Sequence, residues 1–276
     1  MGEATPPRRI LHGCRQLLIL LGLSLTAVLG LAGCTADPAP EAITDVSRWV
    51  WRNYAIATDA RLADAVVALH GQVTAVTADE PLKVLVAELT QADVAQTGRS
   101  DVDPAKARGM LVVTEFGCKL AQVEKIHTAP NQHELHPGAF ATYKRTYAQG
   151  RDAFLTGQVA KLDWTTDITG DYGNGRLIDS ARHVADLGKV QTPFGAALVG
   201  RNWLQAAATG ADWSQDYEVD IYYERTPGRV VHMIAAWRQA SFAGFSTDSS
   251  FLQNIMMDSF VNWDKEIEQH CASGKF

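Results

Sequence analysis

The densest group of side chains with metal-binding chemistry is a histidine cluster in the middle of the chain. His127, His133 and His136 fall within ten residues, with Glu124 and Glu134 close by. Imidazole nitrogens bind zinc and copper, and a loop can bring three of them to one ion. His133 and His136 lie three positions apart, so they lack the four-residue spacing that places two zinc ligands on one helix face. Two interpretations stay open: a metal site, or a solvated loop in which histidines are frequent.

Aspartates recur along a second segment, at Asp163, Asp167 and Asp171. Side chains alternate between the two faces of a strand, so these three share one face. Calcium loops need carboxylates at closer spacing, with a glycine that bends the backbone. A regular strand places each of these aspartates roughly 13 Å from the next. We therefore expect a solvated strand face rather than a calcium site or a pair of catalytic carboxylates.

Large apolar side chains in the second half of the chain are candidates for the lining of a pocket. These are Trp164, Tyr223, Met233 and Trp237. Aromatic residues in strands usually belong to a core, and a sheet that curves enough can enclose a cavity beside that core. His232 has the opposite parity from Met233 and Trp237, so we expect it to face solvent or a cavity, as a weak candidate for a general base.

The chain contains none of the short motifs that identify common catalytic sites. It has no Gly-x-Ser-x-Gly elbow, phosphate-binding loop, dinucleotide-binding glycine pattern, Cys-x-x-Cys or His-Glu-x-x-His. We therefore predict no catalytic residue and no cofactor; an active site assembled from residues far apart in the sequence carries no such motif. The net charge of −6 argues against nucleic acid as a partner.

The N-terminus has the ordered parts of an export signal. Arginines at positions 8, 9 and 15 precede an almost wholly apolar run, 17–31, which ends in Leu-Ala-Gly-Cys34. The run is about 15 residues long, within the range of a signal peptide and short for a membrane span, which needs about 20. Basic residues, apolar run, small residues and cysteine in this order resemble the lipobox of bacterial lipoprotein precursors.

The resemblance implies a processing pathway and a cellular location for the protein. It implies cleavage before Cys34, a diacylglycerol thioether on the Cys34 thiol, and an acyl chain such as palmitate on the new amino group. Two or three acyl chains anchor a protein stably, whereas one binds a bilayer only marginally. The alternatives are an uncleaved anchor and an ordinary signal peptide. Thr35, rather than aspartate, follows Cys34, which under enteric sorting rules favours the outer membrane of the cell envelope over the inner.

Cysteine usage agrees with export. Cys14 leaves with the signal and Cys34 is lipidated, so Cys118 and Cys271 remain as an even pair in an oxidising compartment. We predict a disulfide between them, the alternative being two separate thiols. The residues before Cys34 carry three arginines and one glutamate, so the chain from Cys34 onward has a net charge of −8.

Hydrophobic periodicity predicts helices in the first part of the domain, up to about residue 100. After a proline-containing tether at 34–43, helical stripes occupy 47–56 and 61–69. A capping pattern at 77–80, followed by Pro81, predicts a third helix with Leu82, Leu85, Val86 and Leu89 on one face.

From residue 109 onward the pattern favours strands. The segments expected as strands are 110–116, 121–127, 141–150, 163–172, 177–184, 217–224 and 229–238, with 194–204 of less certain type. Asn174-Gly175 and Thr226-Pro227-Gly228 predict hairpin turns. A final amphipathic helix carries Phe251, Ile255, either Ser259 or Phe260, Trp263 and Ile267, with Cys271 on the same stripe.

This order predicts a single α+β domain over 44–276, behind a signal peptide at 1–33. Runs of strands flanked by helices indicate an antiparallel meander, either a curved sheet or a partial barrel, that grips the long C-terminal helix. The function we favour is an envelope lipoprotein that binds an apolar ligand or a partner protein. The alternatives are a metal-assisted hydrolase that uses His127, His133 and His136, and a purely structural or assembly lipoprotein.

Overall fold

The computed structural model describes residues 37–77, 79–137, 140–171, 177–242 and 244–274, which all belong to one compact unit. The predicted signal peptide, the predicted lipidation site at Cys34 and the predicted Asn174-Gly175 turn lie outside these residues. In the described part of the chain, no helix is both long enough and apolar enough to cross a membrane.

The described strands form one antiparallel sheet of nine strands, in the order β1-β2-β8-β7-β6-β5-β4-β3, with β9 paired to β8. The strands are β1 (Leu82–Val86), β2 (Arg108–Gly117), β3 (Thr142–Tyr147), β4 (Lys161–Asp171), β5 (Leu177–Thr192), β6 (Gly195–Leu204), β7 (Trp213–Thr226), β8 (Arg229–Phe242) and β9 (Phe245–Ser246). From β3 to β8 each strand pairs with its neighbour in sequence, as a meander requires. The predicted fold class is confirmed.

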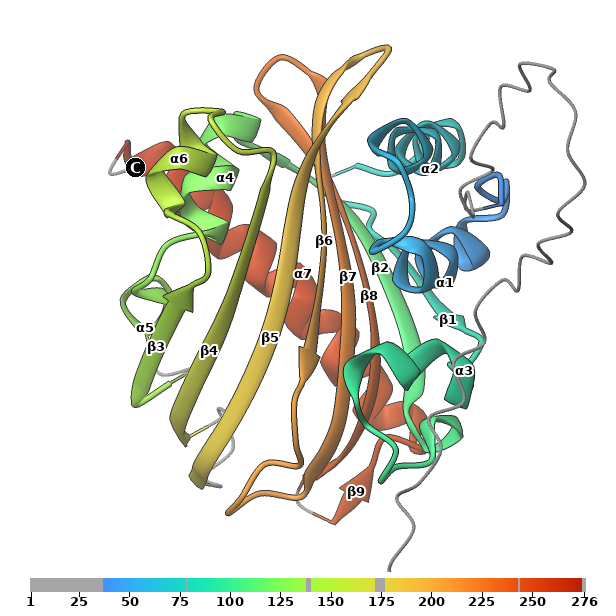
Figure 1. Cartoon of the computed structure of the whole chain (residues 1–276), viewed down its shortest axis with the longest axis vertical. Helices are drawn as coiled ribbons and strands as arrows, with labels where there is room; N and C mark the ends of the chain where they lie inside the picture. Colours follow the sequence, from blue (N-terminus) through green and yellow to red (C-terminus); the bar gives the residue numbers. More distant parts are fainter. Residues whose placement is uncertain (1–36, 78, 138–139, 172–176, 243, 275–276) are drawn as a thin grey trace, which may run out of the picture. The chain divides into compact units, whose positions relative to one another are not determined.

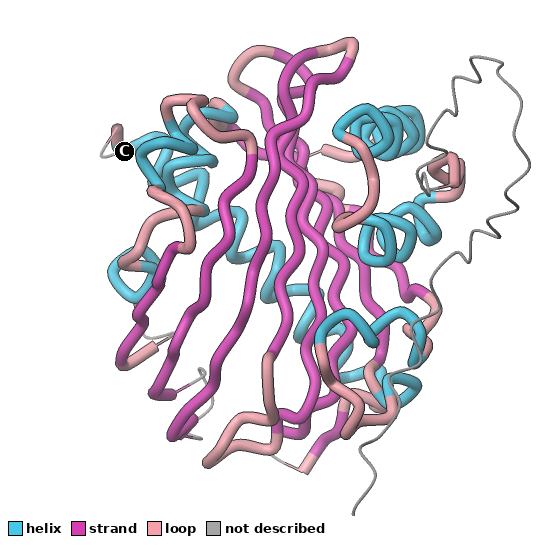
Figure 2. The backbone as a smooth tube through the Cα atoms, viewed as in Figure 1, coloured by secondary structure: helices cyan, strands magenta, loops and turns pink. Residues whose placement is uncertain are grey.

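The helices frame this sheet (Figures 1 and 2). They are α1 (Ile43–Asn53), α2 (Asp59–Gln72), α3 (Gln91–Val94), α4 (Leu120–His127), α5 (Gln132–Leu135), α6 (Arg151–Leu155) and α7 (Ser250–Ser273), with 3-10 turns at Ala95–Thr97 and Pro104–Lys106. Figure 1 shows α7, in red, running along one face of the sheet, and α1 and α2, in blue, on the other.

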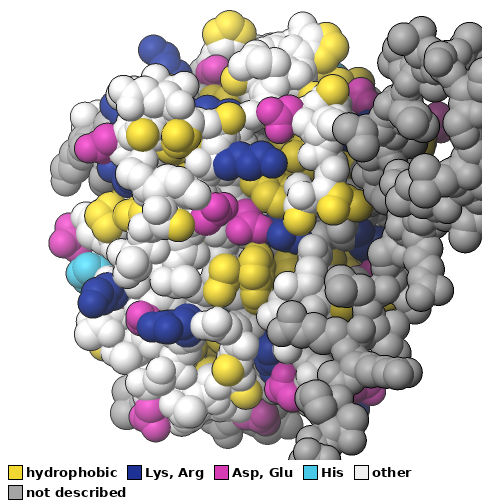
Figure 3. All heavy atoms as spheres, viewed as in Figure 1, with side chains coloured by type: hydrophobic (Ala, Val, Ile, Leu, Met, Phe, Trp, Pro, Cys, Tyr) yellow, Lys and Arg dark blue, Asp and Glu magenta, His cyan; other side chains and the backbone are white. Residues whose placement is uncertain are grey.

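Both faces of the central strands are therefore covered. On β2, Leu111 and Val113 pack with α1 and α2, while Met110 and Val112 pack with α7. A strand buried on both faces reads as a continuous apolar run rather than an alternating one. This accounts for the continuous run of apolar residues from Met110 to Val113. On the described part of the face in Figure 3, charges of both signs are interspersed with hydrophobic side chains.

The segment after Pro81 is a strand, and the predicted helix there is wrong. Leu82 to Val86 pairs antiparallel with β2, and Leu82 lies opposite Val113. Leu82, Val84 and Val86 turn toward the protein, while Lys83 and Leu85 are exposed. This period of two is that of a strand. The helical interpretation placed Leu85 on the buried face, yet it is 56% exposed.

The segment 121–127, predicted as a strand, is helix α4. Its buried residues are Leu120, Val123 and Ile126, three positions apart. That spacing is helical, and a short segment with apolar residues at both periods is ambiguous from sequence. By contrast, the strand predicted within 141–150 is confirmed as β3, which pairs with β4 through Tyr143 and Ile168.

A disulfide joins Cys118, just after β2, to Cys271 in the last turn of α7, with a Cα–Cα distance of 5.5 Å. The predicted pairing is therefore present. It ties the C-terminal end of α7 to the edge of the α4 segment, where Phe116, Val123 and Ile267 form a shared buried cluster.

Candidate ligand-binding site

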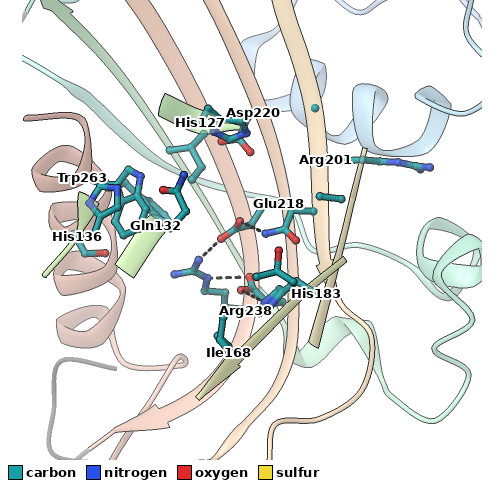
Figure 4. Close-up of a pocket in the computed structure, with 18 of the residues that line it drawn as sticks. His127, Gln132, His136, Ile168, His183, Arg201, Glu218, Asp220, Arg238 and Trp263 are labelled. Atoms are coloured by element: carbon teal, nitrogen blue, oxygen red, sulfur yellow. Dashed lines mark hydrogen bonds and ion pairs between the residues drawn. The ribbon is translucent and has the colours of Figure 1, made fainter. Parts of the chain in front are cut away.

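A cavity of about 480 Å³ lies between the sheet and α7 (Figure 4). Its lining comes from strands β3 to β8, from the α4–α5 segment and from one face of α7. The α7 residues that line it include Ile255, Ser259, Trp263 and Ile267. These lie at intervals of four residues and coincide with most of the stripe predicted for this helix. Phe251, also predicted there, is 56% exposed and packs against Phe245.

Two small residues of the central strands, Ala185 and Gly200, are part of the cavity lining. Ala185 of β5 lies opposite Asn202 of β6, and Gly200 lies opposite Asp220 of β7. Close packing requires glycine at position 200, since a Cβ there would lie 2.9 Å from Leu187 Cδ1. The small residues leave a hollow that the larger side chains around it enclose.

The wall of the cavity is largely apolar. It includes Trp164 and Ile168 on β4, Ile234 on β8, and Met256 and Phe260 on α7. All five side chains are at least nine-tenths buried. Arg145 of β3 lies with its guanidinium 4.6 Å from the centroid of the Trp164 ring and donates to the carbonyl oxygens of His127 and Ala129.

An acidic row forms the polar part of the lining. Asp216, Glu218 and Asp220 alternate along β7, so all three point to the cavity face. Arg238 of β8 donates through Nε to Asp216 at 2.9 Å and through Nη2 to Glu218, and Asn202 donates to Glu218 at 2.9 Å. These contacts are drawn in Figure 4.

The proton of Glu218 is held unusually tightly. Burial raises the pKa of Glu218 to about 7, and the neighbouring charge of Asp216 acts in the same direction, while Arg238 opposes it. A carboxyl group with a pKa near neutrality can gain or lose a proton at physiological pH. His183 of β5 adds an imidazole, with Nε2 3.7 Å from Asp216 Oδ2.

His232 joins the sheet to α7. Its Nδ1 lies 2.8 Å from Asp264 Oδ1 on α7, and its Nε2 lies 3.1 Å from Asp220 Oδ1 on β7. Its ring stacks on Tyr222 at a centroid distance of 3.9 Å. Burial alone would lower the pKa of His232, but Asp264 and Asp220 together raise it to about 9. At neutral pH His232 is therefore a buried cation held by two carboxylates.

His127 behaves in the opposite way. Burial lowers its pKa to about 4, against the attraction of Asp220. Its Nδ1 lies 3.4 Å from the Tyr222 hydroxyl, and its ring meets Trp164 edge-on. At neutral pH this side chain is an uncharged imidazole in the cavity lining.

The structure does not bring the three histidines of the predicted metal site together. His133 lies on α5 near Glu134, while His136 is buried, bonds Glu266 through Nδ1 and stacks on Trp263 at 3.3 Å. In the described residues no three histidine, cysteine, aspartate or glutamate side chains are grouped so that they could hold a metal ion.

The predicted aspartate face behaves as a solvated strand surface. Asp167 pairs with Arg182 across β4 and β5, and Asp163 accepts from Gln149. The side chain of Asp171 lies outside the described residues. These two aspartates have local partners of their own, as the interpretation of a solvated face expected.

Of the four residues predicted to line a pocket, Trp164 does so and the other three do not. Tyr223, Met233 and Trp237 lie on the opposite face, packed with α1 and α2. The prediction assumed that the large apolar residues mark the cavity, but a sheet covered on both faces has such residues on both. The cavity residues on these two strands have the other parity.

The cavity residues of β7 and β8 that the sequence did not identify include Asp216, Glu218, Asp220, Ile234 and Arg238. One signal was available: the opposite parity of His232 pointed to solvent or a cavity, and the residues of the same parity on both strands include these five. Arg201, which pairs with Asp186, lies over the rings of Trp51 and Trp203, and Figure 4 shows it directed away from Glu218.

Comparisons with known proteins found distant similarities of structure only. No protein family and no curated protein matches the sequence. A START superfamily protein from Mycobacterium smegmatis is 10% identical, with 60% of this chain and 97% of that chain covered and a TM-score of 0.38. A STAR-related lipid transfer protein fragment from Xanthomonas axonopodis is 12% identical, with 62% of this chain and 89% of that chain covered and a TM-score of 0.40.

A third similar structure is dicamba monooxygenase bound to 3,6-dichlorosalicylic acid. It is 11% identical over 61% of this chain and 49% of that chain, at a TM-score of 0.43. This chain thus spans about half the length of that enzyme. At these identities and TM-scores the similarities say nothing about ligand or activity.

Proposed function

We propose that this protein binds an amphipathic small molecule in the cavity between the sheet and α7, and that it does so as a lipid-anchored protein of the cell envelope. The observation that carries the first part is the cavity, which combines an apolar wall with a polar row on β7. Ligand sites in proteins have this composition, with a few polar groups that fix orientation, and volumes of roughly 300–1,000 Å³.

The binding proposal follows from the loss of packing that an unfilled cavity would cause. An empty cavity of about 480 Å³ forfeits the packing contacts that its wall would otherwise make. Ala185 in the cavity wall keeps the space open, where a larger side chain would fill it. A ligand with an apolar body would restore contacts with Trp164, Ile168 and Phe260, and its polar end would meet the acidic row.

Support for the anchor comes from the N-terminal sequence alone. The arginines, the apolar run and Leu-Ala-Gly before Cys34 have the order of a lipoprotein signal. The disulfide between Cys118 and Cys271 is compatible with an oxidising compartment, where such bonds persist. We propose the outer membrane rather than the inner because Thr35 follows the cysteine.

Ligand binding is tested with a polarity-sensitive fluorescent probe. The full chain is purified, held in an amphipathic polymer, and titrated with N-phenyl-1-naphthylamine. Ala185→Leu adds three carbon atoms at the cavity wall and should weaken binding by about tenfold, or 1.4 kcal/mol. Ala121→Leu, on the exposed side of α4, is the matched control and should bind as the parent does. Equal binding by all three proteins would contradict the proposal.

The anchor is tested by labelling cells with radioactive palmitate and separating their membranes. The parent chain should carry label and sediment with the outer membrane, and its first residue should be a modified Cys34. A Cys34→Ser variant should lose the label. Recovery of an unlabelled parent chain that retains Met1 would contradict this part of the proposal while leaving ligand binding untouched.

A further inference from the structure

The buried polar network beside the cavity contains more carboxylates than cations. Four carboxylates belong to it: Asp216, Glu218, Asp220 and Asp264. The cations that bond them are Arg238 and His232, and His183 lies 3.7 Å from Asp216. Even with His183 counted as charged, the carboxylates outnumber the cations by one.

The other cations that line the cavity do not restore the balance. Arg145 stands on β3, four strands from β7 in the sheet order, and donates to the backbone carbonyls of His127 and Ala129. Arg201 bonds Asp186 and lies over Trp51, on the opposite face of the sheet. A buried excess of negative charge is costly unless a cation or a proton compensates it. The raised pKa of Glu218 is one sign of this cost.

A second and independent observation concerns hydrogen-bond acceptors without partners. The His136 side chain is 2% exposed and lines the cavity, its Nδ1 is bonded to Glu266, and its Nε2 has no partner among the described residues. Burial lowers the pKa of His136. A neutral imidazole that donates through Nδ1 can only accept through Nε2.

Asn202 presents a second such acceptor. Its amide nitrogen donates to Glu218, and its buried Oδ1 has no partner among the described residues. In Figure 4, Gln132, His136 and Trp263 lie on one side of the cavity, and Glu218 and Arg238 lie on the other. Unmet acceptors thus occur on both sides, and a buried acceptor without a donor is destabilising.

We infer that the ligand of this cavity is a cationic amphiphile, an apolar body that carries a protonated amine. This inference rests on the proposed function and specifies its ligand class. An ammonium group has three donors and no acceptor, so beside Glu218 it supplies both the positive charge that the network lacks and a donor to the unmet Oδ1 of Asn202. The amine lies against Glu218 and Asn202, and the apolar body lies against Trp164 and the α7 wall. A carboxylate or phosphate end would face the acidic row and be repelled.

The test compares three competitors of equal chain length: decylamine, decanol and decanoate. Each displaces bound N-phenyl-1-naphthylamine from the full chain at pH 8, where an alkylamine is still protonated. Decylamine should displace the probe at about tenfold lower concentration than decanol, since a charge-assisted hydrogen bond is stronger than a neutral one. Decanoate should be the weakest of the three.

Variants assign the preference to the acidic row. Glu218→Gln and, separately, Asp216→Asn should each reduce the ratio of amine to alcohol potency by about fivefold or more. Glu80→Gln, an exposed glutamate before β1, should leave the ratio unchanged. Using ratios within each protein cancels the partition of the competitors into the polymer, and using two variants guards against the misfolding of either one.

The outcomes separate this inference from the proposal on which it rests. If the probe does not bind, the proposed function fails. If the probe binds and decanol or decanoate competes as well as decylamine, ligand binding stands and the cationic amphiphile is wrong. The cationic amphiphile is also wrong if the amine preference is present but neither Glu218→Gln nor Asp216→Asn alters it.

Discussion

His232 of β8 and Asp264 of α7 bond across the interface between the sheet and its long helix, with 2.8 Å between Nδ1 and Oδ1. Asp264 also accepts from Thr114 of β2, and His232 also bonds Asp220 of β7. One imidazole and one carboxylate therefore hold α7 to three strands, and His232 lines the cavity. Both side chains are almost completely buried.

Removing the charge of Asp264 should loosen this attachment. We expect Asp264→Asn to lower the free energy of unfolding by about 3 kcal/mol, because it leaves a buried cation with one carboxylate fewer. Asp258→Asn, on an exposed position of the same helix, is the control and should change it by less than about 1 kcal/mol. Urea unfolding measures both.

Asp264→Asn should also change how the free energy of unfolding depends on pH. A histidine pKa raised from 6.5 to about 9 stabilises the fold fully below pH 6.5, and this contribution is lost as the pH rises through 9. Asp264→Asn should lower the pKa of His232 and flatten the loss of stability over this window. Nuclear magnetic resonance titration of His232 gives the pKa directly, and an unchanged value would refute the assignment.

Glu218 should make the fold less stable as the pH rises. Its pKa is about 7 in the folded protein against an ordinary 4.5. The folded state keeps the proton that the unfolded state has lost, so stability falls between pH 4.5 and 7 by about 2–3 kcal/mol. Glu218→Gln should lack this fall, and Glu80→Gln should retain it. Urea unfolding at a series of pH values gives the free energy of unfolding of each protein. If this free energy falls with pH equally in the parent and in Glu218→Gln, the prediction is wrong.

The disulfide between Cys118 and Cys271 should stabilise the fold strongly, because the two cysteines are 153 residues apart. The chain-entropy model assigns about 4–5 kcal/mol to such a loop, and measured losses run from about 2 to 5. Unfolding of the parent with and without reductant measures the contribution. A Cys118→Ser, Cys271→Ser double variant should be as unstable as the reduced parent, and reductant should not change its stability.

Gly109 should be intolerant of any side chain. A Cβ there would lie 2.6 Å from the Val86 carbonyl oxygen and 2.7 Å from Trp237 Nε1, which donates to Ala87. Gly109→Ala must displace β1 or Trp237, at a cost of about 2 kcal/mol or more. Gly71→Ala, in α2 with nothing within 4 Å, should instead stabilise by about 0.5–1 kcal/mol. Thermal unfolding measures both variants: Gly109→Ala should lower the melting temperature and Gly71→Ala should raise it.

Several elements could be predicted because local rules and tertiary packing agree there. The hairpin of β7 and β8 shows alternating side chains on both sides of Pro227-Gly228, and Gly228 takes the positive φ of 77° that favours glycine. The segments 82–86 and 120–127 could not be assigned correctly. Each is short, and apolar residues fall at both the helical and the strand period, so only pairing with β2 or packing against α7 decides between them.

The amino-acid order by itself determined the α+β class, the meander of strands, the long last helix and the pairing of Cys118 with Cys271. It also divided the residues of β7 and β8 into two sets, since alternation is a local property of an extended backbone. Which set lines the cavity was decided only by tertiary structure. Tyr223 and Trp237 meet α1 and α2, whereas Glu218 and His232 meet the space under α7. Apolar residues mark both faces of a covered sheet, and only the packing of distant helices decides which face keeps a hollow.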